Sequence, residues 1–275
     1  MKKKRMLHLS LLVVKKMMDP YFQGVAAELA YFFLLSLVPI GILLGQILGV
    51  FSVSADAMTL FLDEYMSSEV TEVLSELLIY RSSSGAMSIA LIVVALWAAS
   101  KAQFSMSQIA NYTFTGAASG KGYIRERLRA IKNIVFTLFT LVFSLLILVY
   151  GELIIHVMTA YAEEFLGITF ILDSFWYLVR WPISLALYFL MISYNYYSLP
   201  TEKVKFREIL PGSILASVGM LLATGIYTYY VRVFANYDIL YGSLASIVAL
   251  LFWFYILGYI LVVGIQFNVA WSETK

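Results

Sequence analysis

The sequence predicts an all-α integral membrane protein with six transmembrane helices and both termini on the cytoplasmic side. Hydrophobic residues make up 61% of the 275 residues and charged residues only 13%, whereas a soluble domain carries about 25% charged residues. Apolar stretches recur along the chain, and each is long enough to cross a bilayer core of about 30 Å as a helix. We therefore expect one membrane domain over residues 1–275.

Residues 1–20 are predicted to form a basic amphipathic helix on the anionic inner leaflet of the membrane. The alternative, a disordered positive tail, stays open. A secretory signal is not favoured, because no small-residue cleavage site follows the short apolar run. The basic residues that would contact lipid headgroups are Lys2, Lys3, Lys4, Arg5, Lys15 and Lys16.

Six stretches are predicted to span the membrane, at approximately residues 27–51, 85–111, 131–157, 175–199, 209–233 and 240–270. Between the first two, residues 52–84 show apolar residues at helical spacing, with acidic residues on the other face. That pattern predicts amphipathic extracellular helices, arranged as an exterior helical hairpin. The hairpin would cap the outer mouth of the bundle or lie on the membrane surface.

The charges between the spans alternate by side and predict the orientation. Fifteen of the 19 basic residues fall in the N-terminal segment, the second connection, the fourth connection and the C-terminus. The opposite connections are mainly acidic. Because basic residues near span ends stay in the cytoplasm, both termini are expected there.

Ionisable and amide side chains at membrane depth are the candidate functional residues, since each needs a partner or a hydrated cavity. Estimated depth suggests two oppositely charged couples, Glu28 with Lys101 on the inner side and Glu152 with Arg180 on the outer side. Each residue also has a structural interpretation, as an interhelical hydrogen bond or a side chain reaching the headgroups. The candidates for a transport path are Glu28, Lys101, Gln108, Asn111, Glu152, Arg180, Asn195, Gln266 and Asn268.

Prolines interrupt the first and the fourth span. Pro39 and Pro182 occupy the first helix of each three-helix half, and broken helices at corresponding positions are typical of inverted-repeat transporters. We therefore treat both prolines as hinge candidates and a 3+3 inverted repeat as one arrangement that fits the pattern.

The sequence lacks the residues and motifs that most enzyme mechanisms require. Cysteine is absent, and no phosphate-binding loop, nucleotide fingerprint, nucleophile elbow or metal-binding helix motif occurs. The two histidines, His8 and His156, are predicted to lie on opposite sides of the membrane. We expect no catalytic residues, no metal site, no cofactor and no specific nucleic-acid partner, and ATP-driven transport would require another subunit.

Two segments resemble a known family. The stretches AAELAYFFLLSLVPIGILL at 26–44 and YGSLASIVALLFWFYILGYILVVGIQFNVA at 241–270 are similar to the characteristic segments of the YihY/BrkB family of bacterial inner-membrane proteins. The resemblance implies a multi-pass protein of the cytoplasmic membrane. It also implies the historical label ribonuclease BN, which no acid–base pair or metal cluster in this chain supports. The family usually has a glutamate where this chain has Gln266.

These observations lead to a functional hypothesis with one alternative. The first interpretation is a membrane transporter or translocase that moves a small solute or a lipid-like amphiphile. The alternative is a non-transporting envelope scaffold or assembly factor. A nuclease is not favoured, and a homo-oligomer is compatible with either interpretation.

Overall fold

The computed structural model describes residues 2–22, 24–50, 71–72, 75, 85–118, 122–166, 173–233 and 245–274, and the regular structure in these ranges is helical. Three segments within them are long and apolar enough to cross a membrane: Pro20–Gln46, Phe206–Tyr230 and Ile247–Glu273. In chain order the elements are α1 (Lys2–Met17), the 3-10 turn η1 (Pro20–Phe22), α2 (Val25–Val50), α5 (Gly85–Thr115), α6 (Tyr123–Leu166), α7 (Asp173–Ser198), α8 (Phe206–Val233) and α10 (Ala245–Glu273).

Each of the six apolar stretches in the sequence corresponds to one of the helices α2 to α10. The helix α6 is the longest, with 44 residues, so it extends over roughly 66 Å, about twice the thickness of a bilayer core. The predicted exterior hairpin at 52–84 falls almost entirely outside the described residues. The predicted basic helix at 1–20 corresponds to α1, followed by η1.

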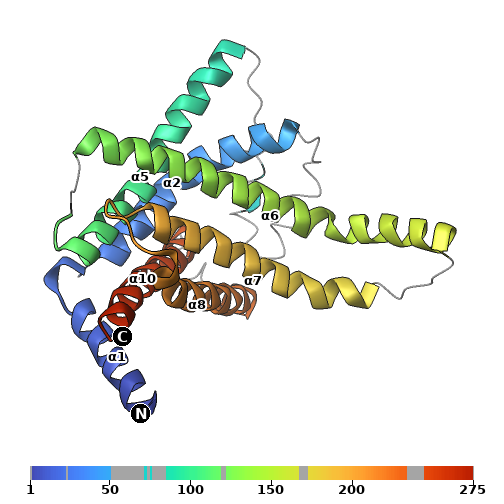
Figure 1. The fold of residues 1–275 in the computed structure, drawn as a ribbon. Helices are drawn as coiled ribbons and strands as arrows, with labels where there is room; N and C mark the ends of the chain where they lie inside the picture. Colours follow the sequence, from blue (N-terminus) through green and yellow to red (C-terminus); the bar gives the residue numbers. More distant parts are fainter. Residues whose placement is uncertain are drawn as a thin grey trace.

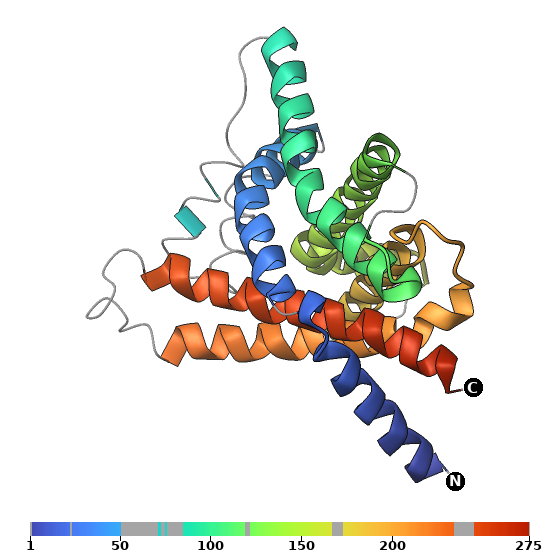
Figure 2. The same cartoon turned by 90° about the vertical axis from the view of Figure 1, so that its left-hand side faces the viewer.

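The six long helices pack in a closed ring. Each helix from α2 to α10 packs against the next one along the chain, and α10 returns to pack against α2. Figure 1 shows α6 and α7 running side by side, and Figure 2 shows α8 and α10 side by side with one end of α2 against α10. The first and last apolar stretches of the sequence are therefore neighbours in space.

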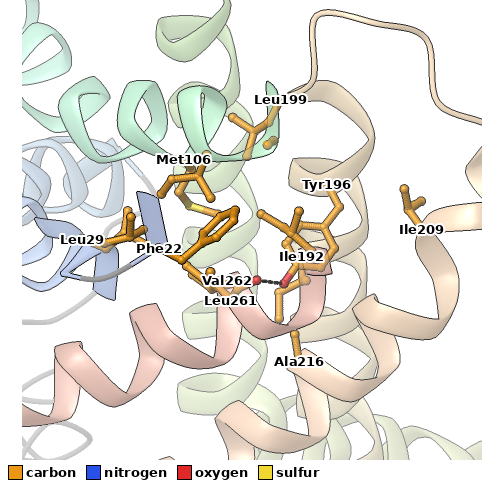
Figure 3. Packing of buried hydrophobic residues seen from close by; sticks show 14 of the residues in the cluster. Phe22, Leu29, Met106, Ile192, Tyr196, Leu199, Ile209, Ala216, Leu261 and Val262 are labelled. Carbon is orange, nitrogen blue, oxygen red and sulfur yellow. Dashed lines mark hydrogen bonds between the residues drawn. The ribbon is translucent and has the colours of Figure 1, made fainter. Parts of the chain in front are cut away.

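The main hydrophobic core lies where η1, α2, α5, α7, α8 and α10 meet. Its central residues, among them Leu29, Leu199, Ile209 and Ala216, are fully buried. Within this core the hydroxyl of Tyr196 donates a hydrogen bond of 2.7 Å to the backbone carbonyl of Leu261, as Figure 3 shows. This bond satisfies a polar group that has no access to water and ties α7 to α10.

Two glycines allow α8 and α10 to approach closely. A methyl group on Gly212 would overlap the carbonyl oxygen of Gly264, and a methyl group on Gly264 would overlap the hydroxyl of Tyr196. The backbone N–H of Gly212 also donates a 2.6 Å hydrogen bond to the side-chain oxygen of Asn268. Small residues thus bring the two backbones together, and the amide fixes their register.

Candidate functional site

Polar side chains from α5, α6 and α7 form a buried group that we call the amide cluster: Gln103, Asn133, Thr137, Asn195 and Ser198. The hydroxyl oxygen of Thr137 accepts hydrogen bonds from Gln103 Nε2 at 3.2 Å and from Asn195 Nδ2 at 3.3 Å. One helical turn away, Ser198 Oγ donates to Asn133 Oδ1 at 2.8 Å. Three helices are therefore joined at one polar point.

The amide cluster has spare hydrogen-bonding capacity. Gln103, Asn133 and Asn195 are each at most 6% exposed. Gln103 Oε1, Asn195 Oδ1 and Asn133 Nδ2 have no partner among the described residues. For Asn195 the orientation is fixed, because its Nδ2 also donates to the carbonyl of Met191 at 2.8 Å. Since buried polar atoms are normally paired, these atoms have hydrogen-bonding capacity that the described residues leave unused.

Beside the cluster, α6 and α7 form a groove that we call the aromatic groove. Its cavity volume is about 360 Å³, within the range of small-molecule sites. Phe139 and Leu190 are 67% and 56% exposed, so the groove opens to the surface. It is lined by Phe136, Phe139, Thr140, Phe143, Leu187, Leu190, Ser193, Tyr194, Tyr197 and Phe206.

The aromatic groove and the amide cluster share the α6–α7 contact. The rings of Phe136 and Tyr194 stack at 3.6 Å in the groove wall, and the next residue on each helix, Thr137 and Asn195, belongs to the cluster. Ser193, which also lines the groove, is 2% exposed and its hydroxyl has no partner among the described atoms. The wall of the aromatic groove and the amide cluster are therefore formed by adjacent residues of α6 and α7.

Basic residues flank one end of the aromatic groove. Lys132 is exposed and precedes Phe136 by one turn on the same side of α6. Arg129, one turn earlier, donates to Thr201 Oγ1 at 3.1 Å. Lys205 and Arg207, both exposed, flank the groove residue Phe206. This end favours anionic groups, while the rest of the groove is apolar.

Three of the sequence-predicted candidates act as packing contacts. Asn111 accepts the backbone N–H of Thr201 at 2.6 Å, so it holds the connection between α7 and α8 against α5. Asn268 binds Gly212, as described above. Gln266 Nε2 donates to Thr113 Oγ1 at 3.3 Å and is 1% exposed. A carboxylate at position 266 could not donate this bond, which gives the amide in this chain a structural role.

Two further candidates, Glu28 and Lys101, do not form a direct ion pair in the described structure. Glu28 instead accepts a 2.7 Å hydrogen bond from Ser105, one turn beyond Lys101 on α5. The salt bridge recorded for the described side chains joins Lys16 and Glu273 at 2.8 Å. Lys101 is exposed and Gln108 is half-buried on the same helix.

The outer couple and the hinges remain predictions. Glu152 lies on α6 and Arg180 on α7, but their side chains lie outside the described residues. Pro39 and Pro182 fall inside α2 and α7, and both helices continue on either side of the proline. Of the candidate amides, the structure brings Asn195 together with Gln103 through Thr137, and it places Asn111, Gln266 and Asn268 in separate helix contacts.

Sequence reasoning missed the hydroxyl residue that joins the amide cluster, as well as one buried cation. Thr137 is a weak signal in an apolar span, although its spacing of four from Asn133 places both on one helix face. Arg127 was expected among the orienting charges of a loop. It is 2% exposed, its guanidinium lies 4.6 Å from the ring centre of Trp97, and it donates to the Trp97 carbonyl. Its charge is thus accommodated by an aromatic face.

Among the described residues, no group of three histidine, cysteine or acidic side chains is placed to hold a metal ion. The site therefore offers hydrogen bonds, aromatic surface and positive charge. Helices of this length and apolarity define a helical membrane protein.

Comparison with known proteins identifies the family. The chain belongs to the virulence factor BrkB family, whose pattern matches residues 13–275. It is 28% identical to the ribonuclease-like protein YfkH of Bacillus subtilis strain 168, over 92% of this chain and 91% of that protein. It is 26% identical to a UPF0761 membrane protein of Vibrio atlanticus, over 91% of this chain and 78% of the relative. No solved structure matches.

Proposed function

We propose that this protein moves a lipid-like amphiphile across the bacterial cytoplasmic membrane along the α6–α7 face. The observation that supports this proposal is the aromatic groove, which is open and apolar, lies one residue step from unsatisfied buried amides and ends among basic residues. A fully polar substrate would not bind to the apolar surface of the groove. A fully apolar substrate would not form hydrogen bonds with the amides or ion pairs with the basic residues.

In this proposal the tail of the amphiphile lies in the aromatic groove. Phenylalanine and tyrosine rings give a large apolar contact area at low entropic cost, which suits a flexible chain. The headgroup enters at the basic end, where Lys132, Lys205 and Arg207 attract a phosphate or a carboxylate. It then meets Ser193 and the free oxygens of Gln103 and Asn195, which replace part of its hydration inside the membrane.

The proposal includes six spans with both termini in the cytoplasm. The distribution of charges along the sequence supports this arrangement, because basic residues near span ends stay in the cytoplasm. In that orientation the basic end of the groove faces the cytoplasmic leaflet, where anionic lipids are found. The homologues' membrane-protein names support the location, and their ribonuclease-like name is not carried over to this chain.

A lipid-scrambling assay tests the proposal. Full-length protein is reconstituted into vesicles that contain fluorescent phosphatidylglycerol or fluorescent phosphatidylcholine, and a membrane-impermeant quencher reports lipids that reach the outer leaflet. Wild-type protein is expected to accelerate movement of the phosphatidylglycerol probe. Leu190→Trp, which fills the groove, should slow it by about tenfold, the effect of roughly 1.4 kcal/mol on the barrier.

Ile226→Trp provides the matched control, because Ile226 is 70% exposed on α8 and lies outside the groove. It should leave the rate within about twofold of wild type, since a surface substitution that touches no binding feature changes little. Equal rates for both tryptophan variants, or a wild-type rate equal to that of empty vesicles, would contradict the proposal and favour a scaffold that does not transport.

A further inference from the structure

The N-terminal helix α1 has two apolar faces, and the fold uses only one of them. Leu9 and Val13, which are 1% and 9% exposed, pack against Ala270 and its neighbours at the end of α10. Leu11 and Val14 are 59% and 51% exposed, and Met18, just after the helix, is 68% exposed. We call Leu11, Val14 and Met18 the exposed face of α1.

The helix geometry puts these two faces on opposite sides. At about 100° per residue, Leu11 lies roughly 160° around the helix from both Leu9 and Val13, whereas Leu11 and Val14 lie about 60° apart. The packed face therefore cannot cover the exposed face. An apolar face in this position needs a partner other than the helix bundle itself.

The fold fixes the direction of the exposed face. Lys16 forms a 2.8 Å salt bridge with Glu273 near the end of α10. Just beyond α1, Asp19 accepts the backbone N–H of Tyr21 at 2.9 Å, and the ring of Tyr21 stacks on Tyr112 of α5 at 3.7 Å. The contact of α1 with α10, together with the contact of the following turn η1 with α5, holds the helix in one orientation.

The charge of α1 indicates what covers the exposed face. The helix carries Lys2, Lys3, Lys4, Arg5, Lys15 and Lys16 and no acidic residue, and Lys15 is exposed next to Val14. An apolar stripe on a helix that carries cations and no acidic residue matches the headgroup region of an anionic bilayer, which offers both acyl chains and negative charge.

We propose that α1 binds the anionic leaflet of the membrane through its exposed face while its opposite face holds the end of α10. The family pattern begins at residue 13, so most of α1 lies outside the part of the chain that the family match covers. The contact with α10 connects lipid binding at α1 to the helix bundle. Ala270, which contacts α1, lies two residues from Asn268, which accepts a hydrogen bond from Gly212 of α8. This inference is independent of the proposed transport.

The absence of native cysteine allows a direct test in the full-length protein. A polarity-sensitive fluorophore is attached to Leu11→Cys, and to Glu72→Cys as an exposed control outside α1, in an acidic connection. Each labelled protein is placed in nanodiscs of pure phosphatidylcholine or with roughly one quarter phosphatidylglycerol, and a neutral water-soluble quencher is added. With phosphatidylglycerol, quenching at position 11 should fall about threefold, and salt at about 0.5 M should reverse part of the effect.

Two comparisons decide the outcome. The control at position 72 should be quenched alike in both lipids, because the nearest charged residues in the sequence are acidic. The combined variant Lys2→Gln, Lys3→Gln, Lys4→Gln and Arg5→Gln, with the Leu11 probe, should lose most of the dependence on phosphatidylglycerol, because the charges that attract the leaflet are removed. Equal quenching at position 11 in both lipids, or efficient crosslinking of Leu11→Cys into a dimer, would overturn the proposal.

Discussion

At the scale of single residues, the close contact between α8 and α10 depends on two glycines, which have no side chain. Gly212 and Gly264 bring the backbones of α8 and α10 together, and Asn268 fills the remaining space with a hydrogen bond to the Gly212 N–H. The sequence contains 16 glycines, and their spacing alone does not distinguish these two from the rest. What matters is the atom that a methyl group would meet.

Gly212→Ala should therefore destabilise the protein. The added methyl group overlaps backbone, which cannot rotate away, and overpacking of this kind costs about 1–3 kcal/mol or more. Gly225→Ala is the matched control on the same helix, because no atom lies within 4 Å of its added methyl group. It should be neutral or stabilising by up to about 1 kcal/mol. Thermal unfolding in detergent compares the two, and equal transition temperatures would contradict the predicted close contact.

At the scale of elements, α6 and α7 are joined by successive contacts of different chemistry. Phe136 stacks on Tyr194, Thr137 accepts from Asn195, and Asn133 accepts from Ser198. The ring stack borders the aromatic groove, and the hydrogen bonds form the amide cluster. One helix pair thus presents an apolar face and a polar face in the same turns, which is the arrangement that an amphiphile requires.

Thr137→Val tests how much the amide cluster contributes. The change keeps the shape and removes the acceptor shared by Gln103 and Asn195, so stability should fall by about 1–2 kcal/mol. Thr228→Val is the control, since Thr228 Oγ1 is buried without a partner among the described residues and the change should be neutral or stabilising. Chemical unfolding in detergent measures both variants. A larger loss for Thr228→Val would show that the cluster is not a stabilising contact.

At the scale of the whole molecule, the six long helices form a ring in which the first and the last of them are in contact. The helices α2 and α10, from opposite ends of the sequence, pack together, and α1 adds to the end of α10. The ring is compatible with six spans, and the proposed orientation follows from the distribution of basic residues. The cysteine-free sequence again makes this orientation accessible to experiment.

Single-cysteine labelling in intact cells should map the two sides. Glu202→Cys, in the connection between α7 and α8, is expected to react with a membrane-impermeant maleimide only after the cells are permeabilised, because this connection carries Lys203, Lys205 and Arg207. Asp238→Cys, in a connection outside the described residues, should react in intact cells. The reverse pattern would contradict the proposed orientation.

Much of the fold could be predicted because apolar length and charge are local properties of the sequence. The predicted spans fall on helices, closely for the stretch 175–199 and α7, whereas α6 extends well beyond both ends of the predicted span 131–157. The site could not be predicted in the same way. Estimated depth paired Glu28 with Lys101, but Glu28 accepts a hydrogen bond from Ser105. Arg127 was counted among the basic residues of a connection, but its guanidinium lies over the ring of Trp97. Rotation about a helix axis decides such contacts, and apolar length carries no information about rotation.

The sequence by itself determined that this is a helical membrane protein, which six apolar stretches it has, and which polar side chains lie within them. Those features follow from the cost of exposing apolar surface to water and of burying charge in lipid. Only the tertiary structure decided which amides meet. Separate hydrogen bonds between structural elements are formed by Asn111, Gln266 and Asn268. By contrast, Gln103 and Asn195 both donate to Thr137 beside the aromatic groove. The reason is that hydrogen bonds depend on ångström-scale approach and direction, which packing of the whole ring sets.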